Sequence, residues 1–279
     1  MAGTMDMPSA LKSIAAEAAR GELSFPTSVQ VALKIKEALD APDCHIDTAA
    51  RLVQSEPLLA AKVVAMANSA AFNPYGREIT QVRAAFSRLG FATVRALATA
   101  LATRQLAGSL PNPEHRAMAE QLWEHTVQVA ALARVLAVHI THQDPETALF
   151  AGIVHEVGSF YLLSRLDDYP DLLAAPLQED EDDEDAISRA VVKALGVPDT
   201  VTAALEGFWP GYLALPPLSL ADTLLLADEL APAKSPFHEP RAIDTPAAML
   251  DVTIGEENLT GVLEESAEEV QSLIAALKL

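Results

Sequence analysis

The sequence contains few of the residues that build strands, disulfides or membrane spans. Aromatic residues make up 5% of its 279 positions, and Cys44 is its single cysteine, so an intrachain disulfide is excluded. The richest apolar stretch, residues 127–140, is interrupted by polar side chains and is too short to cross a bilayer. Residues 1–10 lack the basic start and apolar core of a secretory signal. These absences predict a soluble, cytoplasmic protein.

Positive charge is also scarce. The 19 Lys and Arg residues face 39 Asp and Glu residues, which gives a formal net charge of −20 at pH 7. Such a chain repels the phosphates of nucleic acids and the surface of an anionic membrane, so neither partner is expected. The short helices expected within residues 47–71 resemble a helix-turn-helix, which leaves a DNA-binding regulator as one hypothesis. Its recognition helix would carry Lys62 as its one cation, which is poor for phosphate contact.

The signatures of several enzyme classes are missing. The sequence has no G-x-G-x-x-G, no Walker-type lysine loop, no G-x-S-x-G and no paired-cysteine motif. Dinucleotide-dependent enzymes, P-loop nucleotidases and serine hydrolases of the common type are therefore disfavoured. The chemistry that remains is that of histidines combined with carboxylates.

Helix-forming residues are abundant. Half of the chain is apolar, and Ala and Leu dominate over the β-branched and aromatic residues that strands prefer, which predicts an all-α fold. Apolar residues recur at helical spacing between Pro, Gly and Asn turn signals. Helices are expected at residues 27–39, 47–53, 57–71, 80–90, from 91 onward, 114–140, 145–166, 186–195, 199–208, 218–230 and 256–279. Gly90 is expected to separate two of them.

Two segments call for a separate interpretation. Residues 179–185 are acidic without interruption, and we expect a solvated loop there, because like charges at close spacing oppose regular structure. A cation site is the alternative, but the run lacks the Gly and the spacing of a calcium loop. Asn68 lies in an apolar helix and needs a partner if it is buried, so we expect it to hydrogen-bond a neighbouring turn. A ligand contact is the alternative for Asn68.

The histidines and carboxylates that stand out are His125, the pair His155-Glu156, and Asp228. Around them and upstream lie stretches that resemble the HD-related output domain, or HDOD, family of bacterial signal transduction. Met66-Ala67-Asn68-Ser69 is the most specific of these stretches. It lies within residues 55–70, and the other stretches are residues 26–39, 79–90 with Gly90, Trp123-Glu124-His125, residues 150–156 and Leu226-Ala227-Asp228.

This resemblance implies a two-lobed helical fold with a degenerate HD-like bundle. We expect residues 1–110 to form the N-terminal lobe, with Asn68, Ser69 and Gly90 as structural residues, and residues 111–279 to form the C-terminal lobe with its last helix. A groove between the lobes is also expected.

In HD phosphohydrolases, which the second half resembles, the corresponding residues hold a divalent metal; here they are His125, His155, Glu156 and Asp228. Glu156 departs from the Asp of the family pattern, and no histidine lies between Glu156 and Asp228 to bind a second ion. Ser159 stands where active members often have a basic residue. We therefore expect no metal, no cofactor and no catalysis, with the four residues as remnants that hydrogen-bond one another. A pocket that binds an ion or metabolite without turnover is the alternative.

The resemblance thus predicts a non-catalytic signal-transduction module that acts by binding a protein partner in trans. The competing hypothesis is a metal-dependent phosphohydrolase acting on a nucleotide or cyclic dinucleotide, with a single divalent ion. The partner and the oligomeric state stay open at this stage.

Overall fold

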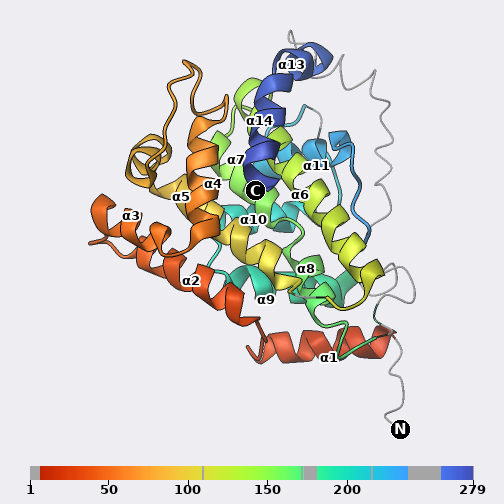
Figure 1. The fold of residues 1–279 in the computed structure, drawn as a ribbon. Helices are drawn as coiled ribbons and strands as arrows, with labels where there is room; N and C mark the ends of the chain where they lie inside the picture. Colours follow the sequence, from red (N-terminus) through yellow and green to blue (C-terminus); the bar gives the residue numbers. More distant parts are fainter. Residues whose placement is uncertain are drawn as a thin grey trace.

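A computed structural model describes residues 7–108, 110–170, 172, 181–214, 216–237 and 259–278. Every regular element in this part of the chain is a helix, which confirms the all-α prediction (Figure 1). The long helix α6 (Pro113–His139) runs through the middle of the structure, and many of the other helices pack against it or against α5 (Val82–Leu106). The buried residues of these helices, mostly Ala, Leu and Val, form one continuous core.

The first part of this core is built by α2 (Thr27–Asp40), α3 (Ile46–Gln54), α4 (Pro57–Asn68) and α5, which pack together around α5. Within α5 the backbone of Gly90 has φ 77° and ψ 172°, so the helical path breaks there. A positive φ of this kind is open to glycine and costly for other residues. The break expected at Gly90 is therefore present.

The helix predicted over residues 57–71 is shorter, because α4 ends at Asn68. The side chain of Asn68 donates to the carbonyl of Ile79 at 2.6 Å and accepts from the Ile79 amide at 2.8 Å. The Ser69 hydroxyl donates to the Met66 carbonyl at 2.7 Å. These bonds replace the next turn of the helix and tie its end to the turn before α5, as expected for Asn68.

Removal of the Asn68 amide should weaken this tie. We expect Asn68→Ala to lower the free energy of unfolding by about 2 kcal/mol, because two partly buried backbone groups of Ile79 lose their partner. Asn68→Asp should be no better than alanine, since a carboxylate cannot donate to the Ile79 carbonyl. Urea denaturation measures both. Asn73→Ala is the control: it removes one exposed bond to the Arg77 amide, and an equal loss there would contradict the role given to Asn68.

Two helices stand where the pattern of residues 145–166 predicts one. These are α7 (Pro145–Val154) and α8 (Val157–Ser164), and the break between them falls at His155-Glu156. Glu156 has φ −105° and ψ 20°, outside the helical region, so α8 leaves α7 at a new angle. The segment Pro145–Ser164 is long and apolar enough to cross a membrane by composition, but 83% of the relevant window is buried in the structure. Core helices of folded proteins show the same combination.

The acidic run is not the loop predicted from its charge. Residues 181–185 form the first described turns of α9 (Glu181–Ala194), whereas Glu179 and Asp180 lie outside the described residues. A carboxylate oxygen of Asp185 lies 3.7 Å from a guanidinium nitrogen of Arg189, one turn further along. This pair offsets part of the repulsion between the like charges.

The remaining helices complete the core on two sides. Helices α10 (Asp199–Phe208) and α11 (Leu220–Leu230) pack against each other, and both contact α7. Helices α13 (Leu259–Glu265) and α14 (Ala267–Lys278) end the described chain, and α14 packs against both α4 and α6 (Figure 1). At the other end, α1 (Met7–Ala19) packs against α9.

Contacts between the two predicted lobes are extensive. Helix α1 reaches α9, α5 packs against α7 and α8, and α14 bridges α4 and α6. The buried Lys36 of α2 donates to the Gly196 carbonyl at 3.0 Å, across the same junction. The boundary near residue 110 therefore stays a prediction, and the two parts share one core.

Candidate functional site

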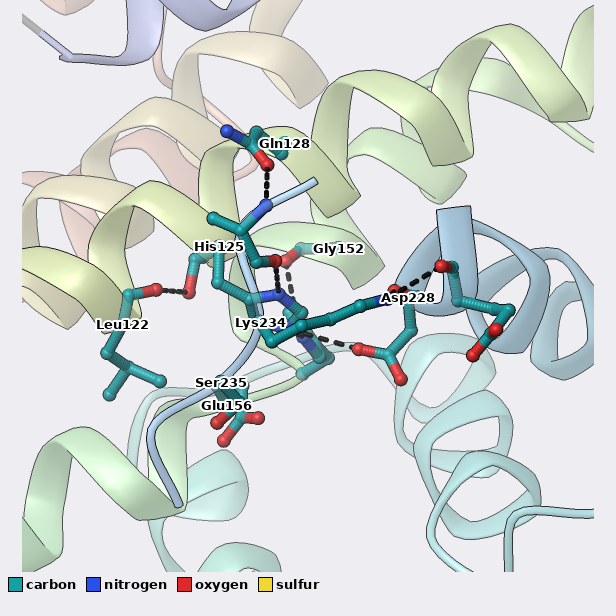
Figure 2. Close-up of polar contacts among 12 residues, drawn as sticks. Leu122, His125, Gln128, Gly152, Glu156, Asp228, Lys234 and Ser235 are labelled. Atoms are coloured by element: carbon teal, nitrogen blue, oxygen red, sulfur yellow. Dashed lines mark hydrogen bonds and ion pairs between the residues drawn. The ribbon is translucent and has the colours of Figure 1, made fainter. Parts of the chain in front are cut away.

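Three of the four candidate residues lie together where α6, the α7–α8 break and α11 meet (Figure 2). The Nε2 atom of His125 lies 3.1 Å from Nε2 of His155 and 3.0 Å from Oδ1 of Asp228. Their potential ligand atoms all lie within 4.8 Å of one another. Both histidines are buried, with 1% and 5% of their surface exposed, whereas the Asp228 side chain is 21% exposed. We refer to these three residues as the histidine cluster.

The outer nitrogen of each imidazole is fixed by a backbone carbonyl. His125 Nδ1 lies 2.9 Å from the Ala233 oxygen, and His155 Nδ1 lies 2.7 Å from the Gly152 oxygen. A carbonyl can only accept, so both Nδ1 atoms carry a hydrogen and both Nε2 atoms turn toward the centre of the cluster. Two bare Nε2 lone pairs would repel at 3.1 Å. A proton or a metal cation between them removes that repulsion.

The electrostatic environment assigns the extra proton to His125. Burial lowers the pKa of His155 to about 4, and the positive field of His125 adds to this effect. Burial also acts to lower the pKa of His125, but the hydrogen bond to Asp228 and the negative charges of Glu156 and Asp228 outweigh it and raise that pKa. His125 therefore holds a proton on Nε2 more readily than His155 does, and a protonated His125 would donate to Asp228 beside a neutral His155.

Glu156, the fourth candidate, is adjacent to the cluster but does not join it. Its Oε2 atom accepts a hydrogen bond from the Ser159 hydroxyl at 2.5 Å, and the residue is 5% exposed. Figure 2 shows its carboxylate apart from that of Asp228. The ring of Phe208 meets His155 edge-on, with 5.5 Å between the ring centroids, and closes another side. The HD-like set of four is therefore a set of three with a neighbouring acid.

The segment after α11 crosses the cluster, and its role was not predicted from the sequence. The Ala233 carbonyl accepts the hydrogen bond from His125 Nδ1, and the Ala233 amide donates to Gln128 Oε1 at 2.8 Å. The next residue, Lys234, runs beside His125, and its ammonium donates to the Glu229 carbonyl at 2.7 Å and to the Asp228 carbonyl at 3.4 Å (Figure 2). Lys234 was not among the residues predicted from the sequence. A lysine soon after a helix that ends near Leu230 is a common cap for its last carbonyls, which is the signal that could have found it.

The residues present fit a single divalent ion. Two imidazole Nε2 atoms and one carboxylate form a donor set that zinc, manganese, iron or nickel can accept. The carbonyl partners of the Nδ1 atoms are the outer-shell contacts that metal-binding histidines commonly have. Among the described residues, the group of candidate ligands has three members, which does not suffice for two ions.

Comparisons with known proteins agree with this architecture. The solved structure of a putative metal-dependent phosphohydrolase from Shewanella amazonensis SB2B superposes with a TM-score of 0.72 at 22% identity, over 96% of this chain and 98% of that one. An HDOD domain protein of unknown function from Geobacter sulfurreducens gives 0.61 at 21% identity, over 98% of both chains. A putative phosphohydrolase from Shewanella amazonensis SB2B gives 0.63 at 21% identity, over 95% and 98%.

At these identities the likeness establishes a shared fold and nothing about activity. No curated protein matches the chain. A family model described as the HDOD domain matches residues 25–209, which is more than half of the sequence. The chain therefore belongs to the HDOD domain family.

Proposed function

We propose that this HDOD protein is a non-catalytic output module of bacterial signal transduction, which acts by binding a protein partner. The observation that carries this proposal is that each of the four HD-like side chains has a hydrogen-bond or ion-pair partner within the protein. The histidine cluster joins α6, the α7–α8 break and α11 through its own hydrogen bonds, and backbone carbonyls hold both outer nitrogens. These contacts give His125, His155 and Asp228 a structural role, and Glu156 accepts a hydrogen bond from Ser159 beside them.

The groups that a phosphohydrolase needs beyond its metal are committed elsewhere. Glu156 accepts from Ser159, and the ammonium of Lys234 is bound to the last carbonyls of α11. A phosphoryl transition state requires donors or cations directed at its developing charge. Lys234 is the cation that the described residues place beside the cluster. Its ammonium could stabilise such a charge only after breaking its hydrogen bonds to the Asp228 and Glu229 carbonyls of α11.

The single cation of the supposed DNA-recognition helix is not available to bind DNA. Lys62 is 1% exposed, and its ammonium donates to the Leu277 carbonyl of α14. A buried lysine cannot contact a phosphate backbone. Together with the formal charge of −20, this favours a protein as the partner.

A metal-dependent phosphohydrolase acting on a nucleotide or cyclic dinucleotide is the second candidate, and the geometry of the histidine cluster is the observation in its favour. His125, His155 and Asp228 would hold one divalent ion, with Glu156 beside it. A bound ion supplies activated water and polarises a phosphate. The chain's own contribution would be to orient the imidazoles through the Gly152 and Ala233 carbonyls and to exclude water with Phe208.

Purified protein loaded separately with Mn²⁺, Fe²⁺, Ni²⁺ and Zn²⁺ distinguishes the two candidates. We expect no hydrolysis of bis(p-nitrophenyl) phosphate, nucleotides or cyclic dinucleotides above the rate of Asp228→Asn. We also expect Asp228→Asn to complement a strain of the native host that lacks this protein as well as the wild-type protein does. The reason is that the amide oxygen can still accept a hydrogen bond from His125. Circular dichroism checks that the variant folds. Metal-dependent turnover that disappears in Asp228→Asn, together with failed restoration, would refute the non-catalytic function.

A further inference from the structure

Helix α14 packs against α4 and α6 through one apolar face (Figure 1). The opposite face of α14 meets solvent at Gln271 and Ala275. Docking surfaces on many proteins recognise amphipathic helices of this kind through apolar side chains at helical spacing. In α14 four such residues are each at most 9% exposed: Val270, Leu273, Ile274 and Leu277.

Polar groups hold α14 along its whole length. At its start, an ion pair joins Glu269 to a guanidinium of α6. Further along, the Ser272 hydroxyl accepts from a backbone amide just after α4 at 2.9 Å. The last two carbonyls of α14 accept from one cation of α4 and one of α5. We call the residues that make these contacts the α14 seat: Lys62, Ala70, Arg104 and Arg134.

Two groups at one end of the seat are poorly satisfied by α14. Burial lowers the pKa of Lys62 to about 8, so its charged form is less stable under α14 than in water. The ammonium of Lys62 lies 5.8 Å from the ring centroid of Trp123. The indole Nε1 of Trp123 is buried and has no acceptor among the described residues. A buried donor without a partner costs about 1–3 kcal/mol, so both groups favour an occupant with a negatively charged acceptor at this end.

The charge of the seat also differs from that of the whole chain. Residues 46–108, which include α4 and α5, contain seven Lys and Arg but three Asp and Glu, although the whole chain carries −20. The last residue of α14 is another cation, Lys278, whose ammonium pairs with Glu124 of α6. A helix that ends in an acidic residue complements Lys62 and Arg104 better than one that ends in lysine.

We propose that the α14 seat binds the protein partner and that α14 is its resident competitor, which the partner displaces. The occupant is an amphipathic helix with the apolar spacing of α14 and a carboxylate in its last turn. That carboxylate supplies the acceptor that Trp123 Nε1 lacks and the negative charge that stabilises the ammonium of Lys62. This inference rests on the proposed function, because it names the surface and the chemistry of that function's protein partner.

Fluorescence anisotropy of labelled peptides added to the full chain tests this proposal. One peptide copies residues 266–278, and a second carries Lys278→Glu in the same sequence. We expect both to bind, and the acidic peptide to bind about fivefold more tightly, because its carboxylate meets the cations of the seat. A third peptide with Leu273→Asp is the control and should not bind, because its apolar face is interrupted.

Two variants of the chain change access to the seat. Leu273→Ala/Leu277→Ala weakens the apolar face of the resident helix and should tighten binding of both peptides at least about tenfold. Ala70→Cys/Ser272→Cys in a Cys44→Ser background should lock α14 by a disulfide, since Ser272 Oγ lies 2.9 Å from the Ala70 nitrogen. The oxidised form should not bind the peptides, and reduction should restore binding. Circular dichroism checks that both variants fold.

Three outcomes would overturn the proposal. Equal peptide affinities of the wild-type, weakened and locked proteins would mean that the peptides bind elsewhere. Loss of the fold in Leu273→Ala/Leu277→Ala would mean that α14 is a fixed part of the core and cannot be exchanged. Equal affinities of the two binding peptides would mean that the occupant is not acidic at its end. Metal-dependent turnover in the hydrolysis assay would refute the proposed function and would leave each of these peptide results as it is, so the two failures are distinguishable.

Discussion

Gly152→Ala should destabilise the protein by about 3 kcal/mol or more, which is a large effect for one methyl group. An ideal Cβ at Gly152 of α7 would lie 2.5 Å from the Cα and 2.8 Å from the nitrogen of Ala130 in α6. Both are backbone atoms and cannot rotate away, so the two helices have to separate. The Gly152 carbonyl also accepts a hydrogen bond from His155 Nδ1, so separation of the helices should disturb the histidine cluster. Urea denaturation measures the loss.

Gly261→Ala provides the control for this experiment. Gly261 lies in α13, and apart from its own helix backbone and chain neighbours no atom of the described residues lies within 4 Å of the position that an added methyl carbon would take. Alanine is the better helix former, so this variant should be unchanged or more stable by up to about 1 kcal/mol. If Gly152→Ala behaves like Gly261→Ala, then α6 and α7 are not in close backbone contact and the described packing is wrong.

The helical content and the position of one sharp break were predictable from sequence because they depend on local signals. Apolar spacing indicated α6 as one long helix, and Gly90 marked the break in α5. The break between α7 and α8 carries no such signal, because no proline precedes it and both flanks are apolar. Local pattern therefore identified the pair of residues but not the joint on which they lie.

The sequence predicted which residues form the site better than it predicted how their side chains are oriented. His125, His155 and Asp228 lie on three separate elements, and their meeting followed from the family resemblance. The orientation of Glu156 toward Ser159 depends on the α7–α8 joint, so no local pattern indicated it. The carbonyls of Gly152 and Ala233 are backbone groups, which residue identity does not reveal. These carbonyls nevertheless decide which imidazole nitrogens face the centre.

The sequence indicated Lys62 only as one of few positively charged residues. Because it is buried, its role in this structure is to bind the end of α14 and not a ligand in solution. Its ammonium lies 5.8 Å from the centroid of the buried Trp123 ring and donates to the Leu277 carbonyl near the end of α14. Arg104 lies over the same ring at 5.5 Å and donates to the Lys278 carbonyl at 2.9 Å. Two cations thus lie at the C-terminal end of α14, where they interact favourably with the negative end of its dipole. They join α4 and α5 to the last described helix.

The seating of Lys62 should make stability depend on pH in the alkaline range. Burial, with a smaller contribution from the charge of Arg104, lowers the pKa of Lys62 from 10.5 to about 8. Between these values the unfolded chain binds more protons than the folded one, so the free energy of unfolding contributed by Lys62 rises with pH. The gain is complete above pH 10.5 and is lost as pH falls through 8. The full change is roughly 3 kcal/mol at most.

Lys62→Met isolates this contribution, because methionine fills a similar volume and does not titrate. We expect the wild-type free energy of unfolding, minus that of Lys62→Met, to increase steadily between about pH 7.5 and about pH 10.5 in urea titrations. Other groups that titrate in this range are common to both proteins and cancel in the difference. Lys34→Met removes a lysine that is not buried from α2 and controls for the loss of one positive charge from an acidic chain. A difference that stays flat across this range would mean that Lys62 reaches water, and α14 would then not be seated on it as described.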